Sequence, residues 1–186
     1  ENMEEFLGSL SKANELNEND WNTNRILGEA SLTLHNFQQS KIYATKAYNA
    51  NPNHPFVLSI YGDALIRNGE VENGIKIFEK MYKMEPIPAM DSNSDRPLKK
   101  LFLAYYLNSD YKKCDEIFNQ IEEHDFQDWF IYMHIKTMQN IEYIKESWYE
   151  MGADKFKDLN WKDEISLFHL NDKELKSSLE SFAESH

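Results

Sequence analysis

The sequence predicts an all-α protein made of antiparallel helix pairs, and two observations support this prediction. First, small and apolar residues recur at a shift of 34 positions between 21–54 and 55–88, and at a shift of 40 beyond residue 95. Second, apolar residues inside each unit lie three or four positions apart, as on one face of a helix. A fixed period of this length is typical of repeat proteins, in which each unit buries its apolar face against the next.

The repeat is read from pairs of equivalent positions. These pairs are Gly28 and Gly62, Pro52 and Pro86, Ala64 and Ala104, Gly74 and Cys114, and Phe78 and Phe118. Two small residues facing each other let paired helices approach closely, whereas large side chains at both places would not fit. The change of shift from 34 to 40 adds six residues, which we place in the polar, proline-containing run PIPAMDSNSDRP at 86–97.

The elements are expected in a fixed order along the chain. Residues 1–20 hold the second helix of a unit whose first helix is missing, because Ala47 falls on Ala13 when the period is subtracted. Complete units follow at 21–54, 55–88 and 95–126, with an insertion at 89–94 and a degenerate unit at 127–155. Turns containing HNF, NGEV or NSDY separate the two helices of a unit. Pro52 has no backbone N–H to donate, so it ends the second helix of its unit.

The fourth unit is predicted to follow the same plan in a shorter form. It has a shortened turn, and its second helix is expected to place three side chains in the packing positions of the preceding unit. These are Ile144, Trp148 and Met151, in the places of Cys114, Phe118 and Ile121.

The pattern resembles the tetratricopeptide repeat (TPR) family, whose unit is a 34-residue helix pair with a small residue in its first helix and a closing proline. The resemblance covers residues 3–155 and is specific for 21–88. Trp21 approximates the early tryptophan of the family, and the third unit lacks the closing proline. The resemblance implies a right-handed superhelix, or TPR solenoid, whose first helices line a concave groove.

The tail at 156–186 does not continue the repeat. An Asn-Asp pair at 171–172 is a helix start signal, and it is followed by Leu175, Leu179 and Phe182 at helical spacing. The last unit of a stacked array needs a cap with a polar outer face. We therefore expect a C-terminal capping helix, with a dimerisation helix as the alternative.

Composition narrows the classes of partner. The formal net charge of −12 and the isoelectric point near 4.9 argue against binding to nucleic acid or to an anionic membrane. The single cysteine, Cys114, cannot form an internal disulfide, which favours a reducing compartment, so we expect the cytoplasm. The chain lacks an apolar run of the roughly 20 residues that a membrane span needs. It opens inside an amphipathic stretch, ENMEEFLGSL, and we expect it to be a piece of a longer protein.

Enzymatic chemistry has little support in the sequence. The histidines stand at 35, 54, 124, 134, 169 and 186, and none forms the i, i+4 pair of a helical metal site. His124, Asp128 and His134 come nearest to a cluster, but ordinary loop and surface roles are more common for such residues. Cys114 occupies a packing position, and no phosphate-binding glycine loop is present. We expect no enzyme activity, no metal and no cofactor.

A binding surface remains, and the repeat indicates which side chains face it. In the first unit these are Asn22, Arg25, Glu29 and Leu32, and the shifts of 34 and 40 carry them to the next two units. The equivalents are Phe56, Ser59, Asp63 and Ile66, and then Arg96, Lys99, Leu103 and Tyr106, with Lys100 beside them. Arg96, Lys99 and Lys100 give this groove a basic end in an acidic chain.

Two narrower resemblances bear on function. Arg25, Arg96 and Lys100 stand where repeats of the carboxylate-clamp type carry cations, but Glu29 and Ile60 replace the two clamp asparagines. Residues 50–184 also look like the C-terminal repeat region of bacterial class III nucleotide cyclases and of winged-helix transcriptional regulators. That second resemblance implies an interaction or regulatory module and transfers no catalytic residue.

Together these observations predict a non-enzymatic scaffold that binds a protein or peptide segment in its concave groove. The expected context is the regulatory C-terminal part of a larger bacterial signalling or transcription protein. An architectural or oligomerisation domain, including a homodimer, and a chaperone-type adaptor are the alternatives. No nucleic acid and no membrane is expected as partner of this part of the chain.

Overall fold

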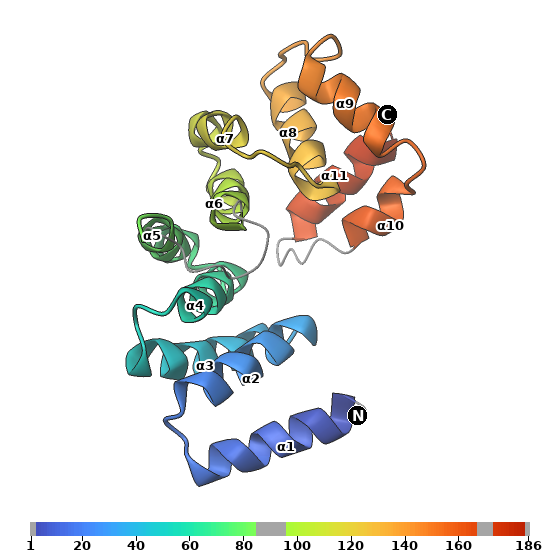
Figure 1. The fold of residues 1–186 in the computed structure, drawn as a ribbon. Coiled ribbons are helices and arrows are strands. Elements are labelled where there is room, and N and C mark those ends of the chain that lie inside the picture. The colour runs from blue at the N-terminus through green and yellow to red at the C-terminus, as the bar shows by residue number, and fades with distance from the viewer. Residues whose placement is uncertain (1–2, 85–95, 167–172, 185–186) are drawn as a thin grey trace.

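The computed structural model describes residues 3–84, 96–166 and 173–184, and this part of the chain forms eleven helices and no strand. Figure 1 shows the helices up to residue 118 following one another in chain order, with the later helices grouped beside them. The prediction of an all-α protein is confirmed. The predicted insertion at 89–94 and the start signal at 171–172 lie outside the described residues.

The helices vary from short to medium length. They are α1 (Met3–Leu16), α2 (Trp21–Thr33), α3 (Phe37–Ala50), α4 (Pro55–Arg67), α5 (Val71–Tyr82), α6 (Arg96–Leu107), α7 (Tyr111–Phe118), α8 (Phe126–Met138), α9 (Ser147–Lys155), α10 (Trp161–Ser166) and α11 (Lys173–Glu184). Polar caps start several of them: Asp20, Asn36 and Asp110 each accept a hydrogen bond from a backbone N–H of the first turn. Pro55 at the first turn of α4 is compatible with a helix start, because the N–H that it lacks has no intrahelical partner there.

Consecutive helices pair into hairpins that pack on one another. The pairs are α2 with α3, α4 with α5, and α6 with α7, and each second helix also contacts the first helix of the following pair. In Figure 1, α3, α5 and α7 follow one edge, while α2, α4 and α6 lie beside them on the side of the C-terminal helices. Helix α2 contacts α4, α4 contacts α6, and α6 contacts α8, so first helices lie next to first helices.

The turn inside each hairpin has the same backbone geometry. A residue with positive φ ends the first helix in each case: His35 (57°), Gly69 (82°), Ser109 (57°) and Asn140 (55°). The next residue donates its N–H five positions back, as Asn36 does to Ser31, at 2.8 Å, and Glu70 does to Leu65, at 2.9 Å. This pairing satisfies carbonyls that the end of a helix leaves open. Three of the four positive-φ residues are separated by the periods read from the sequence.

Glycines sit where helices cross closely. A Cβ atom on Gly28 would lie 3.3 Å from Ile60, and one on Gly62 would collide with the ring of Phe78. Gly74 is likewise in tight contact with Ile66 and with the backbone of Gly62. The small residues that define the repeat are therefore buried at helix crossings, as the sequence predicts.

The fourth hairpin departs from the predicted plan. Ile144 is 64% exposed and Met151 is 73% exposed, so they do not occupy packing positions, and Trp148 is half-buried. The expected short turn is also wrong, because α8 ends at Met138 and α9 begins only at Ser147. The longer connection shifts the register of α9 and brings Gly152 against the indole of Trp129, where a Cβ atom would have no room.

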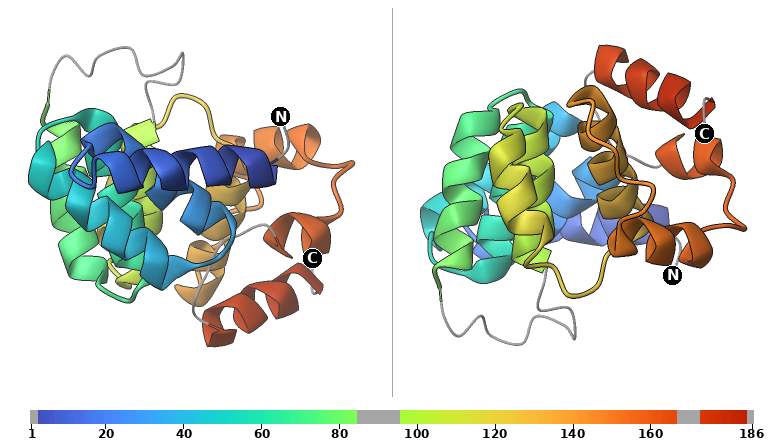
Figure 2. Two further views of the ribbon diagram at one scale, coloured as in Figure 1. Left: turned by 90° about the horizontal axis from the view of Figure 1, so that it is seen from below. Right: turned by 90° about the horizontal axis from the view of Figure 1, so that it is seen from above.

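Aromatic rings fill the C-terminal part of the molecule. Trp129 of α8 lies 5.5 Å from Phe156 and 5.7 Å from Trp161, measured between ring centroids. Phe130 of α8 lies 5.4 Å from Phe182 of α11, in an edge-to-face arrangement. Figure 2 shows α8 to α11 grouped beside the hairpins from two further directions. Leu179 and Phe182, predicted at the apolar face of a tail helix, are buried.

Within the described residues, every helix falls short of the length and apolar character that a bilayer span requires.

Candidate functional site: a charged pocket between four helices

A cavity of about 380 Å³ opens between α2, α4, α6 and α8. This volume lies within the range of small-ligand and side-chain binding sites. The lining residues, called the pocket below, are Leu32, Thr33, Phe37, Asp63, Arg67, Lys99, Lys100, Phe102, Leu103, Asp125, Gln127, Asp128 and Ile131. All of them except Phe37 and Asp125, which lie at the start of α3 and just before α8, belong to first helices of the hairpins.

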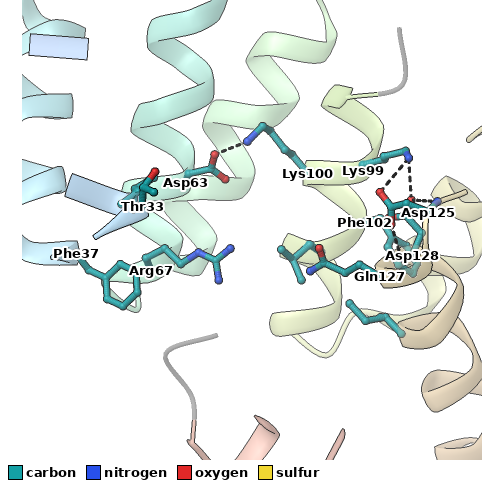
Figure 3. A pocket seen from close by; sticks show the side chains of 13 residues that line it. Thr33, Phe37, Asp63, Arg67, Lys99, Lys100, Phe102, Asp125, Gln127 and Asp128 are labelled. Atoms are coloured by element: carbon teal, nitrogen blue, oxygen red, sulfur yellow. Dashed lines mark hydrogen bonds and ion pairs between the residues drawn. The ribbon is translucent and has the colours of Figure 1, made fainter. Parts of the chain in front are cut away.

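Two ionic bridges cross the seams between hairpins at the pocket wall. Lys100 of α6 pairs with Asp63 of α4. Lys99, one residue earlier on α6, pairs with two carboxylates at the start of α8: its Nζ lies 3.1 Å from Asp125 and 3.3 Å from Asp128. Figure 3 shows both lysines reaching in opposite directions from α6 to these partners. The two bridges fix α4 and α8 against α6.

The two acids at α8 are placed by the start of that helix. Asp125 is the N-cap, and its Oδ1 accepts the backbone N–H of Asp128 at 3.0 Å. In return the Asp128 Oδ2 accepts the backbone N–H of Asp125 at 3.3 Å, which completes a capping box. The positive end of the helix dipole also favours carboxylates at this position. Lys99 thus meets two carboxylates that the helix terminus holds in place.

Arg67 contributes a third cation to the pocket from the last turn of α4. Figure 3 shows its guanidinium pointing from α4 into the cavity. Burial lowers the pKa of this guanidinium, although the nearby Asp63 carboxylate acts in the opposite direction. Because an arginine side chain retains its proton even when its pKa falls somewhat, Arg67 remains a cation in the pocket.

Asp128 titrates in an unusual range. Burial, together with the neighbouring Asp125 carboxylate, raises the pKa of Asp128 to about 7, and the Lys99 ammonium opposes this rise only in part. Its side chain is 5% exposed. The same pair of carboxylates outweighs the effect of burial and raises the pKa of Lys99, so the lysine stays protonated.

The remaining pocket surface is apolar and uncharged. Side chains of this kind come from α2, α6 and α8 and from the start of α3: Leu32, Phe37, Phe102, Leu103 and Ile131, with Thr33 and Gln127 as polar neighbours. With both bridges formed, the three cations and three carboxylates of the lining balance. The pocket is suited to an apolar side chain with a polar or charged neighbour, since such a group would be desolvated between apolar walls and meet fixed charges at the edge.

Four of the residues predicted for the groove line this pocket. They are Asp63, Lys99, Lys100 and Leu103, and Leu32 from the wider set joins them. These residues come from three different helices. The two that are farthest apart in the sequence, Leu32 and Leu103, are separated by 71 positions. The packing of these helices therefore places the side chains together, although no short motif connects them.

A second group of predicted residues lies together at the start of α2 and α4 instead. Arg25 pairs with Glu29 at 2.8 Å and donates to the Oδ1 of Asn22 at 3.2 Å. Its guanidinium also lies over the ring of Phe56, 5.4 Å from the centroid. Arg25 therefore contacts both Glu29 and Phe56, and none of the three belongs to the pocket lining.

Tyr106 differs from the prediction that it faces the groove. It is 3% exposed, and its hydroxyl lies 3.0 Å from Nδ1 of His134 on α8. The equivalent Ile66 is also buried, because it packs against Gly74 within its own hairpin. The predicted site residue Arg96 begins α6, but its side chain lies outside the described residues.

The shifts of 34 and 40 do not indicate Arg67, Asp125 or Asp128 as groove residues. Arg67 lies in the last turn of α4, one residue after Ile66, which is the last groove position that the repeat predicts in this unit. Asp125 and Asp128 belong to the fourth unit, for which no groove positions were assigned. The spacing of the two acids before an apolar run is that of a capping box, which is the signal that could have located them.

The residues weighed earlier for metal or thiol chemistry have packing roles. His124 stacks on Phe118 with 3.9 Å between ring centroids, and His134 is buried against Tyr106. Cys114 is fully buried, and burial raises the pKa of its thiol to about 12. In the described ranges, His, Cys, Asp and Glu side chains do not gather in groups of three that could hold a metal ion.

No protein-family model matches the chain, and no curated protein matches it either.

Proposed function

We propose that the chain is a TPR-type repeat array that binds a protein or peptide segment along the side formed by α2, α4, α6 and α8. The observation that supports this most is the pocket, whose lining comes from the first helices of four successive hairpins. Asp63 and Leu103 occupy the same place in two units, separated by the 40-residue shift. Stacked helix pairs commonly use such a surface for binding.

The recurring turns support the assignment to a repeat array. The same positive-φ turn ends α2, α4, α6 and α8, and close helix crossings occur at Gly28, Gly62 and Gly74. A right-handed superhelix of the TPR type, capped by α11, accounts for these features. The six-residue change of period then corresponds to one insertion and does not change the plan of the hairpin.

Binding would place an apolar side chain of the partner among Leu32, Leu103 and Ile131. Burying one such side chain contributes about 1.5–3 kcal/mol, and a few central anchors dominate most interfaces. The ion-paired lysines at the rim would orient the segment and exclude wrongly charged ones. This role requires no catalytic residue and no cofactor.

The wider context is also a proposal. The resemblance to repeat regions of bacterial nucleotide cyclases and winged-helix regulators suggests a regulatory C-terminal part of a cytoplasmic signalling or transcription protein. The partner would then be a protein or peptide, and the acidic charge of −12 disfavours nucleic acid and anionic membranes.

The test starts from peptides selected against the purified chain from a displayed random library. Their affinity is then measured for Leu103→Glu and for the matched control Ile42→Glu, which introduces the same charge at an outer position that is 52% exposed. Leu103→Glu is expected to weaken binding at least about tenfold, because it places a desolvated charge in the anchor site.

Ile42→Glu should bind like the unchanged chain. Circular dichroism confirms that both variants remain folded. Equal loss in both variants, or loss in the control only, would show that the peptides bind elsewhere and would remove the pocket from the proposal.

A further inference from the structure

We propose that the pocket is controlled by a proton: when Asp128 takes up a proton, Lys99 becomes available to a carboxylate of the bound segment. This inference rests on the proposed function and names its regulation and the chemistry of the ligand. It predicts that acidic segments bind with net proton uptake, and that uncharged segments bind without it.

The geometry of Lys99 is the first step. Its ammonium is shared between two carboxylates of different exposure, since the side chain of Asp125 is 55% exposed and that of Asp128 is 5% exposed. Asp125 can be solvated when a competitor approaches, but Asp128 is enclosed. The buried carboxylate is therefore the partner that holds Lys99 in the wall.

Few partners stabilise the ionised carboxylate of Asp128. The oxygen that faces Lys99 also accepts the backbone N–H of Asp125, at 3.3 Å. A proton on this carboxyl group removes the attraction for Lys99 and leaves Asp125 as its partner. The capping bond from the Asp128 N–H to Asp125 is unaffected, so α8 keeps its start.

The charged groups of the pocket lining determine the net effect; Lys99 and Asp125 contact Asp128, and the others line the same cavity. Lys99 and Lys100 come from α6, Asp63 and Arg67 come from α4, and Asp125 precedes α8. With Asp128 ionised, this set balances. With Asp128 protonated, cations exceed carboxylates by one, and the excess charge lies in a cavity with apolar walls, where a carboxylate interacts more strongly than in water.

The ligand chemistry follows from this excess. Lys99 stays protonated across the neutral range, because the two carboxylates raise its pKa. A glutamate side chain on the partner has an ordinary pKa of about 4.3, so it is ionised in the neutral range as well. Burial raises the pKa of Asp128 to about 7, so the change of pocket charge falls in the physiological range.

The experiment compares two capped peptides, acetyl-Leu-Glu-Leu-amide and acetyl-Leu-Gln-Leu-amide, by NMR titration of the chain at pH 6 and pH 8. The Glu peptide is expected to bind about fivefold more tightly at pH 6, which corresponds to a coupling of about one pKa unit for a group that titrates near pH 7. The Gln peptide should bind equally at both values. In the ligand-free chain the Asp128 carboxyl carbon should titrate near pH 7 and move to higher pH when the Glu peptide is added.

Two variants sharpen the test. Asp128→Asn should bind the Glu peptide at pH 8 as tightly as the unchanged chain does at pH 6. The matched control is Asp115→Asn, which removes a carboxylate paired with Lys136 at 2.6 Å outside the pocket lining, and it should keep the pH dependence. If Asp128→Asn does not fold, the carboxyl titration of the unchanged chain decides alone.

The possible failures are distinguishable. Equal binding of the Glu peptide at both pH values, or an Asp128 carboxyl that titrates below pH 5, overturns the proton control and leaves the proposed function intact. Binding by library-selected peptides but not by the Glu peptide also overturns it. Selected peptides that bind away from Leu103 overturn the proposed function itself.

Discussion

The hairpins α2 to α5 and the C-terminal group α8 to α11 achieve close packing by different means. In the first region glycines at helix crossings allow backbones to approach, as at Gly28, Gly62 and Gly74. In the second, aromatic rings such as Trp129 and Phe130 fill wider gaps between helices of uneven length. Both regions have buried side chains at their helix contacts, but only the first shows a period in its sequence.

The difference has a consequence for the pocket. Helix α6 lies between the two regions: Lys100 bridges it to Asp63 of α4, and Lys99 bridges it to Asp125 at the start of α8. Regular packing aligns the first helices of the hairpins. The aromatic rings of α8 to α11 hold α8 in place, and α8 forms one wall of the pocket. The pocket therefore depends on both regions and on the ionic bridges of α6. Substitutions in each of these places test their separate contributions.

The largest effect is expected from the aromatic region. Trp129→Ala should lower the free energy of unfolding by about 3–5 kcal/mol, because it removes a side chain that is 1% exposed and leaves a cavity among Phe156 and Trp161. Urea unfolding measures this change. The control Met151→Ala, at a side chain that is 73% exposed, should change it by less than about 0.5 kcal/mol.

The regular region should respond to added volume with opposite signs at two glycines. Gly62→Ala is expected to destabilise by about 1–3 kcal/mol, because the new methyl group would collide with the enclosed ring of Phe78. Gly8→Ala in α1, where nothing lies within 4 Å, should stabilise by about 0.5–1 kcal/mol through helix propensity. Thermal unfolding of both variants tests the pair. Equal effects would contradict close packing at the crossing of α4 and α5.

The boundary should show a smaller, pH-dependent effect. The pKa of Asp128 is higher in the folded state than the ordinary value, so the folded chain binds more protons than the unfolded chain between pH 4 and pH 7. The stability that this proton contributes at low pH is lost as pH rises through about 7, by roughly 1–2 kcal/mol between pH 6 and pH 8. Asp128→Asn should remove this slope in urea unfolding. Asp154→Asn, at an exposed side chain, should retain it.

Much of the fold could be predicted from the sequence because small residues at a fixed period are visible without coordinates. Gly62 and Gly74 identify crossings, and the turn residues His35 and Gly69 repeat at 34. The fourth hairpin could not be placed in this way. Its turn is longer, and Gly152 packs against Trp129 at a position that no earlier unit indicates.

The site could be predicted only in part for a related reason. Lys99 and Leu103 follow from the repeat, but the carboxylates that hold Lys99 belong to α8, whose register is not fixed by a period. The shifts of 34 and 40 predict a groove position for Tyr106 but carry no information on the helix that packs over it. His134 of α8 covers it, and that contact depends on the tertiary position of α8.

The central claim is that a partner segment binds in the pocket between α2, α4, α6 and α8. The most direct measurement attaches a nitroxide spin label to a library-selected peptide and records methyl NMR signals of the chain. Binding in the pocket should strongly broaden the methyl signals of Leu32, Leu103 and Ile131, with little effect at Ile42 or Ile144. Broadening centred on Ile42 or Ile144, with the pocket methyl signals unchanged, would contradict it.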